Sequence, residues 1–205
     1  MKCKLGVLGV LVFLFASSHA QKLSNYLPLN EGKYYKFEVV SGRGGYARGS
    51  TEWTMLAARE LNGRSVRPRR VTPNGGASFI NFLEDDGRAI CVVATQKPND
   101  PEPIKQKPLC LLKAPLSAGA TWSTNVYVPG SDEPLLIQST IETLDETVTV
   151  PAGTFRSCLR VHSRGSRGEH TLEDIFWYAP EIGVIKFIRK EEGATTVSSQ
   201  LAAYN

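Results

Sequence analysis

Short runs of apolar and β-branched residues, with no long amphipathic stretch, make up most of this 205-residue chain. Turn signals such as Asn62-Gly63 and Asp86-Gly87 separate the runs, and these pairs favour tight hairpins because the central residues of such turns adopt positive φ. No stretch repeats apolar residues every 3.6 positions over three turns. The pattern predicts antiparallel strands that follow one another as a meander. The predicted strands are residues 33–40, 51–60, 64–71, 78–83, 88–95, 109–112, 121–128, 135–144, 147–150, 155–163, 171–178, 183–189 and 195–204.

Two further hairpins are predicted in the last third of the chain. A Pro-Ala-Gly turn at 151–153 joins two strands, and a Pro-Glu-Ile-Gly turn at 180–183 joins an aromatic strand to the next one. Glycine supplies the positive φ that a tight turn needs, so Gly153 is expected to have positive φ.

Several predicted strands are apolar on both faces. Ile175–Tyr178 is the clearest case, because neighbouring side chains of a strand point to opposite sides of the sheet. A single strongly curved antiparallel meander sheet, forming a half-barrel or open barrel, covers both faces without helices, and a two-sheet β-sandwich is the alternative. We expect the bulky aromatics Trp53, Trp122, Trp177 and Phe155 in the core, with Phe155 buried beside Trp177.

The first 20 residues have the pattern of a secretory signal peptide. Lys2 and Lys4 precede an apolar run at 5–15, and Ser18 and Ala20 lie three residues and one residue before a cleavage point that follows Ala20. The run is shorter than the roughly 20 residues that span a bilayer, and no later segment approaches that length. The pattern predicts a periplasmic or secreted protein with one antiparallel β domain over residues 21–205 and no transmembrane segment.

The charge of the chain does not indicate a nucleic-acid partner. Without the two lysines of the signal peptide, the formal net charge falls from +4 to +2. Arg64, Arg67, Arg69 and Arg70 form the densest positive cluster, which could hold an anionic polymer or lipid headgroup. Residues 64–68, which combine charged and apolar residues and end in Pro68, favour another interpretation. They are typical of an edge strand whose charges and proline prevent unwanted strand pairing.

No catalytic, cofactor-binding or metal-binding residues are predicted, and the protein is interpreted as a non-enzyme. Beyond the signal peptide the histidines are His162 and His170, and no Gly-x-Ser-x-Gly motif is present. Residues 84–87 carry acids without the alternating spacing of a calcium loop. The other carboxylates considered for sugar hydrolysis lie in patterns of solvated strands and turns: Glu133, Glu142, Asp145, Glu146, Glu173 and Asp174.

A symmetrical hairpin closed by residues 164–168 would place His162 opposite His170, with Asp174 on the face of His170. Two imidazoles and a carboxylate are ligands for zinc or copper. However, Asp174 would lie about 13 Å along the strand from His170, too far to share one ion. A surface histidine pair is therefore expected instead of a metal site.

Three cysteines remain after the signal peptide, so one intramolecular disulfide at most can form in an oxidising compartment. Cys91 and Cys110 flank the proline-rich segment 97–108 almost symmetrically, which would place them opposite each other on neighbouring strands. They are the predicted pair, with two reduced core cysteines as the alternative. Cys158 is left over in either case.

The chain resembles a family of exported bacterial β proteins of unknown function. The resemblance rests on the Val-Pro-Ala-Gly-Thr-Phe turn at 150–155 followed by Cys158, and on the Trp-Tyr-Ala-Pro segment at 177–180 followed by Gly183 and Lys186. Weaker similarities are found at 26–29 with Gly32, at Pro115, Leu116, Gly119 and Trp122, and at 199–201 with Tyr204. The resemblance implies an envelope or secreted protein with no catalytic residue to transfer, distantly similar to curved-sheet lipoprotein carriers.

The sequence thus favours a non-catalytic exported envelope protein that binds or carries a hydrophobic ligand, such as a lipid, or a protein partner on a concave β surface. The alternative is a structural subunit that assembles through its edge strands. A hydrolase, which is less favoured, would need His162 or His170 in contact with a serine and an acid.

Overall fold

The computed structural model describes residues 22–42, 49–126, 134–167 and 170–205, and its strands build one antiparallel sheet. The predicted signal peptide and Glu133 lie outside these residues. The elements are α1 (Leu23–Tyr26), β1 (Tyr34–Gly42), β2 (Gly49–Met55), β3 (Arg59–Leu61), β4 (Arg64–Pro73), β5 (Phe79–Asp85), β6 (Ala89–Gln96), β7 (Ile104–Lys113), β8 (Thr121–Val126), β9 (Leu135–Val150), β10 (Gly153–Arg167), β11 (His170–Ala179), β12 (Gly183–Glu191) and β13 (Ala194–Tyr204).

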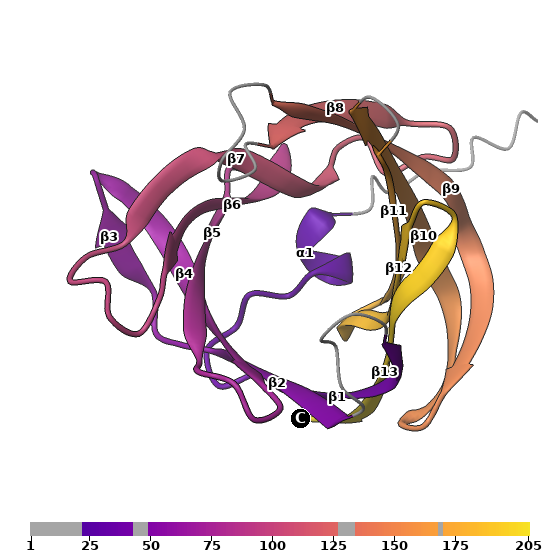
Figure 1. Ribbon diagram of the computed structural model, residues 1–205, viewed down its shortest axis with the longest axis horizontal. Coiled ribbons are helices and arrows are strands. Elements are labelled where there is room, and N and C mark those ends of the chain that lie inside the picture. The colour runs from indigo at the N-terminus through magenta and orange to yellow at the C-terminus, as the bar shows by residue number, and fades with distance from the viewer. Residues whose placement is uncertain (1–21, 43–48, 127–133, 168–169) are drawn as a thin grey trace, which may run out of the picture.

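The sheet curls into a barrel that is closed except along one seam (Figure 1). Twelve strands follow the order β7-β6-β5-β4-β2-β1-β13-β12-β11-β10-β9-β8, and β3 pairs with β4 outside this path. The ends of the path, β7 and β8, face each other across the seam. The curved meander predicted from the sequence is therefore confirmed, and the two-sheet sandwich is wrong.

The sequence did not indicate α1, a helix of four residues inside the ring of strands (Figure 1). Its Leu23 and Tyr26 are buried, and Tyr26 Oη donates to the carbonyl oxygen of Ser157 at 3.1 Å. One helical turn is too short to show a 3.6-residue period. In the described part of the chain, no helix has the length and apolar character needed to cross a membrane.

The two faces of the sheet can be assigned from one electrostatic interaction. Arg69 on β4 interacts electrostatically with Tyr178 on β11, although β2, β1, β13 and β12 separate these strands in the sheet. The two side chains therefore both face the barrel interior. Leu159 and Val161 on β10 share the inner face with Tyr178, and both are almost completely buried. Arg160 and His162 alternate with them and belong to the outer face.

Local turn chemistry is confirmed where glycine or asparagine must adopt positive φ. Asn62 and Gly63 have φ of 54° and 74°, and Gly153 has φ of 139°. The predicted break between residues 144 and 147 is wrong, because β9 continues through it to Val150. Register shifts between β9 and β10 accommodate the extra residues, and Ser157 with φ of 51° lies at one of them. β7 also begins inside the predicted proline-rich loop, at Ile104.

The edge-strand interpretation of the arginine cluster is wrong. β4 pairs with β2 on one side and with β5 on the other. Pro68 fits there because β2 ends opposite Arg69, so the missing N–H of the proline interrupts no pairing with β2, and its carbonyl accepts from Leu56 N at 2.9 Å. Charges and a proline usually mark an edge, but here Arg69 points into the barrel and is 6% exposed.

The prediction that four bulky aromatic residues lie in the core is confirmed for two of them. Trp122 and Trp177 are buried, whereas Trp53 and Phe155 are partly buried against the core. Phe155 does not lie beside Trp177. The β10–β11 pairing begins only at Leu159, so Phe155 lies beyond its end, and its ring lies 6.0 Å from that of Tyr204.

The predicted disulfide is confirmed. Cys91 on β6 and Cys110 on β7 are cross-strand partners joined by an S–S bond, with a sequence separation of 19. Cys158 is a free, buried thiol, and burial raises its pKa to about 11. Trp122 on β8 donates its Nε1–H to Cys110 O at 3.1 Å, so the disulfide-bearing strand is also hydrogen-bonded across the seam.

Candidate functional site

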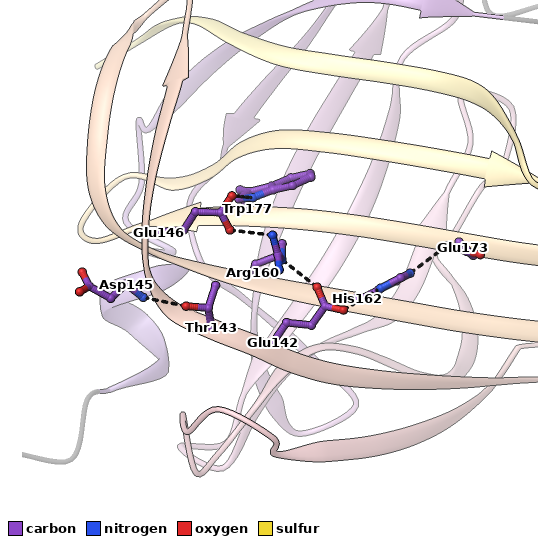
Figure 2. Close-up of polar contacts among 8 residues, drawn as sticks. All are labelled: Glu142, Thr143, Asp145, Glu146, Arg160, His162, Glu173 and Trp177. Carbon is purple, nitrogen blue, oxygen red and sulfur yellow. Dashed lines mark hydrogen bonds and ion pairs between the residues drawn. The ribbon is translucent and has the colours of Figure 1, made fainter.

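A network of charged side chains covers the outer face of β9, β10 and β11 (Figure 2). Arg160 Nε lies 2.7 Å from Glu142 Oε2, and Arg160 Nη1 lies 3.0 Å from Glu146 Oε2. His162 bridges two carboxylates, with Nδ1 at 2.9 Å from Glu142 Oε1 and Nε2 at 3.0 Å from Glu173 Oε2. Three acids that the sequence left as solvated residues are thus brought together around one arginine and one histidine.

A β-bulge produces this arrangement. Arg160 pairs with Thr143 while Val161 pairs with Ile141, so Glu142 is the extra residue of β9 and can join the outer face. The network reaches β11 through Trp177, whose indole Nε1–H donates to Glu146 Oε1 at 3.1 Å. This contact depends on the register of three strands, and nothing in the local sequence around Glu142 indicated it.

Carboxylates alternate with Arg160 and His162 in the network. Partial burial opposes ionisation of Glu142, but its hydrogen bond with His162 and the charge of Arg160 outweigh that effect and lower its pKa. Both ring nitrogens of His162 face carboxylates, so neither is placed to take a proton from a serine hydroxyl.

The predicted pairing of the two histidines is wrong. His162 pairs with Ile175 across the hairpin, whereas His170 pairs with Arg167, because β10 continues through the residues expected to form the loop. Asp174 instead binds Arg189 in a bidentate ion pair with both contacts at 2.8 Å. Among the described residues no group of three or more His, Cys, Asp or Glu side chains is placed to hold a metal ion.

The inner face carries a different polar cluster, which we call the inner arginine cluster and define as Arg69, Tyr35 and Tyr178. Arg69 interacts electrostatically with both tyrosines, and its guanidinium carbon lies 4.3 Å from the centroid of the Trp53 ring. Burial lowers the pKa of Arg69 to about 10 and raises that of Tyr35 to about 12. At neutral pH the cluster therefore holds one positive charge and two neutral phenols.

Two buried polar atoms of this cluster, Arg69 Nε and Tyr35 Oη, have no hydrogen-bond partner among the residues that the structure describes. Buried polar groups in folded proteins are nearly always paired, so these two atoms need an explanation. The sequence placed Arg69 among surface charges. Its position two residues from Val71, a core residue on the same face, was the one signal that it points inward.

The seam also bears a surface groove of about 330 Å³, lined by residues of both edge strands. Its wall on β7 includes Lys105 and Leu109, and its wall on β8 includes Asn125 and Val126. The two edge strands are therefore separated by a groove over this part of the seam.

No family model matches the chain, and no curated protein matches it. The chain is similar in fold to two solved structures. One is the crystal structure of an inferred exported protein with a YmcC-like fold from Bacteroides fragilis NCTC 9343. The two chains share 16% sequence identity with a TM-score of 0.44, and the match covers 86% of this chain and 96% of that one. The other is an inferred lipoprotein of Parabacteroides distasonis ATCC 8503, with 14% identity, a TM-score of 0.47 and coverage of 87% and 97%. The motif resemblance to a family of exported proteins stays a prediction.

Proposed function

We propose that the protein is an exported, non-catalytic binding protein that holds a hydrophobic ligand against the inner face of its open barrel. The observation that carries this proposal is the unsealed seam with its groove between β7 and β8. A fully paired barrel has no edges, whereas this one has two edge strands that no backbone pairing joins. The proposal takes the groove between them as the entry for the ligand.

The character of the inner face supports an apolar ligand. Tyr35, Phe37 and Met55 are almost completely buried, and Trp53 packs on Phe37 with ring centroids 4.5 Å apart. Binding sites for small molecules are mostly apolar with a few placed polar groups, and the inner arginine cluster has that character. Export itself rests on the signal-peptide pattern of the first 20 residues.

Assembly through edge strands is less well supported. The edge strand β7 carries Lys105, Lys107 and Pro108, and lysine and proline on an edge oppose pairing with another chain. Catalysis has no support in the outer network, where the imidazole of His162 is held between carboxylates. Both observations favour binding over the two alternatives.

Quenching by a brominated fatty acid tests whether a ligand binds and on which face. Bromine quenches tryptophan at contact distance, and the chain has three tryptophans. Trp53 packs with Phe37 and Arg69 on the inner face, whereas Trp177 lies on the outer face beside Glu146. We expect saturable quenching at micromolar ligand, competed by host lipid, in the wild-type protein and in Trp177→Phe.

Trp122 also lies on the inner face, because it pairs with Ser139, which pairs with Ser163 on the face of Val161. Trp53→Phe should therefore reduce the quenching to the part contributed by Trp122, while still binding the fatty acid in a separate competition assay. Quenching that persists in Trp53→Phe and disappears in Trp177→Phe would place the ligand on the outer face. Either that result or a non-saturating titration contradicts the proposed function.

A further inference from the structure

Arg69 is a buried cation for which no described residue supplies a counter-ion. Arg69 is 6% exposed, and the groups that interact with it electrostatically are two tyrosines, which are neutral at neutral pH, and not a carboxylate. A buried charge is costly unless it is paired and hydrogen-bonded. The folded chain therefore maintains a positive charge inside the barrel without the partner that such a charge normally has.

One N–H group of the Arg69 guanidinium, that of Nε, is left without a hydrogen-bond partner among the described residues. The guanidinium carbon of Arg69 lies 4.3 Å from the centroid of the Trp53 ring, so the ring packs against the group in a cation–π contact. The N–H donors lie in the plane of the group and point away from its edges. In the described part of the chain, Arg69 Nε has no hydrogen-bond partner, and Tyr35 Oη, a second possible donor in the same cluster, also has none. The cluster thus presents unused donors beside a positive charge.

We propose that the inner arginine cluster binds the oxyanion head, a carboxylate or a phosphate, of an amphiphile whose apolar chain lies along the inner face of the barrel. An oxyanion accepts two parallel hydrogen bonds from a guanidinium and further ones from phenolic hydroxyls. It would supply the counter-ion that Arg69 lacks and partners for the two unpaired atoms. The inference rests on the proposed function and adds the chemical class of the ligand head.

A pair of probes with the same chain isolates the head. cis-Parinaric acid carries a carboxylate, and its methyl ester carries none, so their affinities differ through the head alone. At neutral pH we expect the wild-type protein to bind the acid about 10- to 100-fold more tightly than the ester, because only the acid can form charge-assisted hydrogen bonds with Arg69.

Arg69→Met should abolish this preference by weakening the binding of the acid. Arg70→Met is the matched control, because Arg70 is the next residue of β4 and is exposed. It should keep the wild-type preference. Lysophosphatidate as competitor distinguishes a phosphate head from a carboxylate head, and inorganic phosphate alone tests whether the site takes a free anion instead of an amphiphile.

Thermal stability separates a ligand-binding arginine from a structural one. If Arg69 serves the ligand, Arg69→Met without ligand should melt at the wild-type temperature or above it, because it removes an unpaired buried charge. A clear fall in melting temperature together with a retained preference for the acid would overturn the inference. If Arg69→Met does not fold, Arg69→Lys keeps the charge without the planar fork and should show a reduced preference.

The outcomes distinguish failure of the inference from failure of the proposed function. Equal affinity of the wild-type protein for acid and ester overturns the anion site and leaves hydrophobic binding in place. Displacement of the acid by millimolar inorganic phosphate overturns the amphiphile and assigns the cluster to a free anion. Absence of saturable binding for both probes overturns the inference and the proposed function together.

Discussion

Reduction of the Cys91–Cys110 disulfide should destabilise the protein without changing its fold. The two cysteines are direct partners on β6 and β7, and these strands also pair along the rest of their length. Opening the S–S bond therefore removes no strand pairing. Its main effect is to release the unfolded chain from a closed loop, so the free energy of unfolding should fall.

The sequence separation of 19 sets the magnitude. Closing a loop of about 20 residues lowers the entropy of the unfolded chain enough to contribute about 3 kcal/mol at 25 °C. For a domain of this size, each kcal/mol shifts the melting temperature by about 2–4 °C, so reduction should lower it by about 6–12 °C.

Urea denaturation of the oxidised and reduced wild-type protein measures this effect with no change of sequence. The same comparison of oxidised and reduced protein should be made in the Cys158→Ala variant, in which no free thiol can exchange with the disulfide. Trp122→Phe provides a second check, because Trp122 binds the carbonyl of Cys110 across the seam. If the bridge acts through the unfolded chain, the cost of reduction is the same with and without Trp122. Equal stability of oxidised and reduced protein would refute the reasoning.

Three further outcomes are expected. Trp122→Phe should lower the free energy of unfolding by about 1 kcal/mol through loss of the hydrogen bond to Cys110 O, measured in urea; an unchanged midpoint would show that the seam contact is not stabilising. Cys158 should not react with an aromatic disulfide reagent until the protein unfolds, because burial raises the pKa of its thiol to about 11; rapid labelling of the native protein would contradict this. Because the pKa of Glu142 is lowered in the folded protein, ionised Glu142 stabilises the fold above its unfolded pKa, and this contribution is lost as the pH falls through the folded pKa. The difference in free energy of unfolding between the wild type and Glu142→Gln should therefore become smaller as the solution is acidified from pH 6 towards about pH 3. Glu60→Gln, at an exposed site, is the control and should show no such change. A difference for Glu142→Gln that stays constant with pH would refute the assignment.

The sequence alone determined the features that depend on neighbouring residues. The turns at Asn62-Gly63 and at Gly153 follow from φ preferences of single residues, and the structure has both. Antiparallel strands followed from short apolar runs between such turns. The Cys91–Cys110 bond was predictable because a symmetrical hairpin brings equidistant residues together, and its strands adjoin in sequence.

The tertiary structure decided the features that depend on register and on which face of a strand turns inward. A one-residue shift in pairing exchanges the faces of a strand, and β-bulges cause such shifts without a clear sequence signal. For that reason Glu142 joined Arg160 and His162, and His162 did not face His170. Closure of the barrel had the largest effect, because it turns the face of β4 that carries Arg69 toward the interior, where Arg69 is a buried cation and not one of four surface charges.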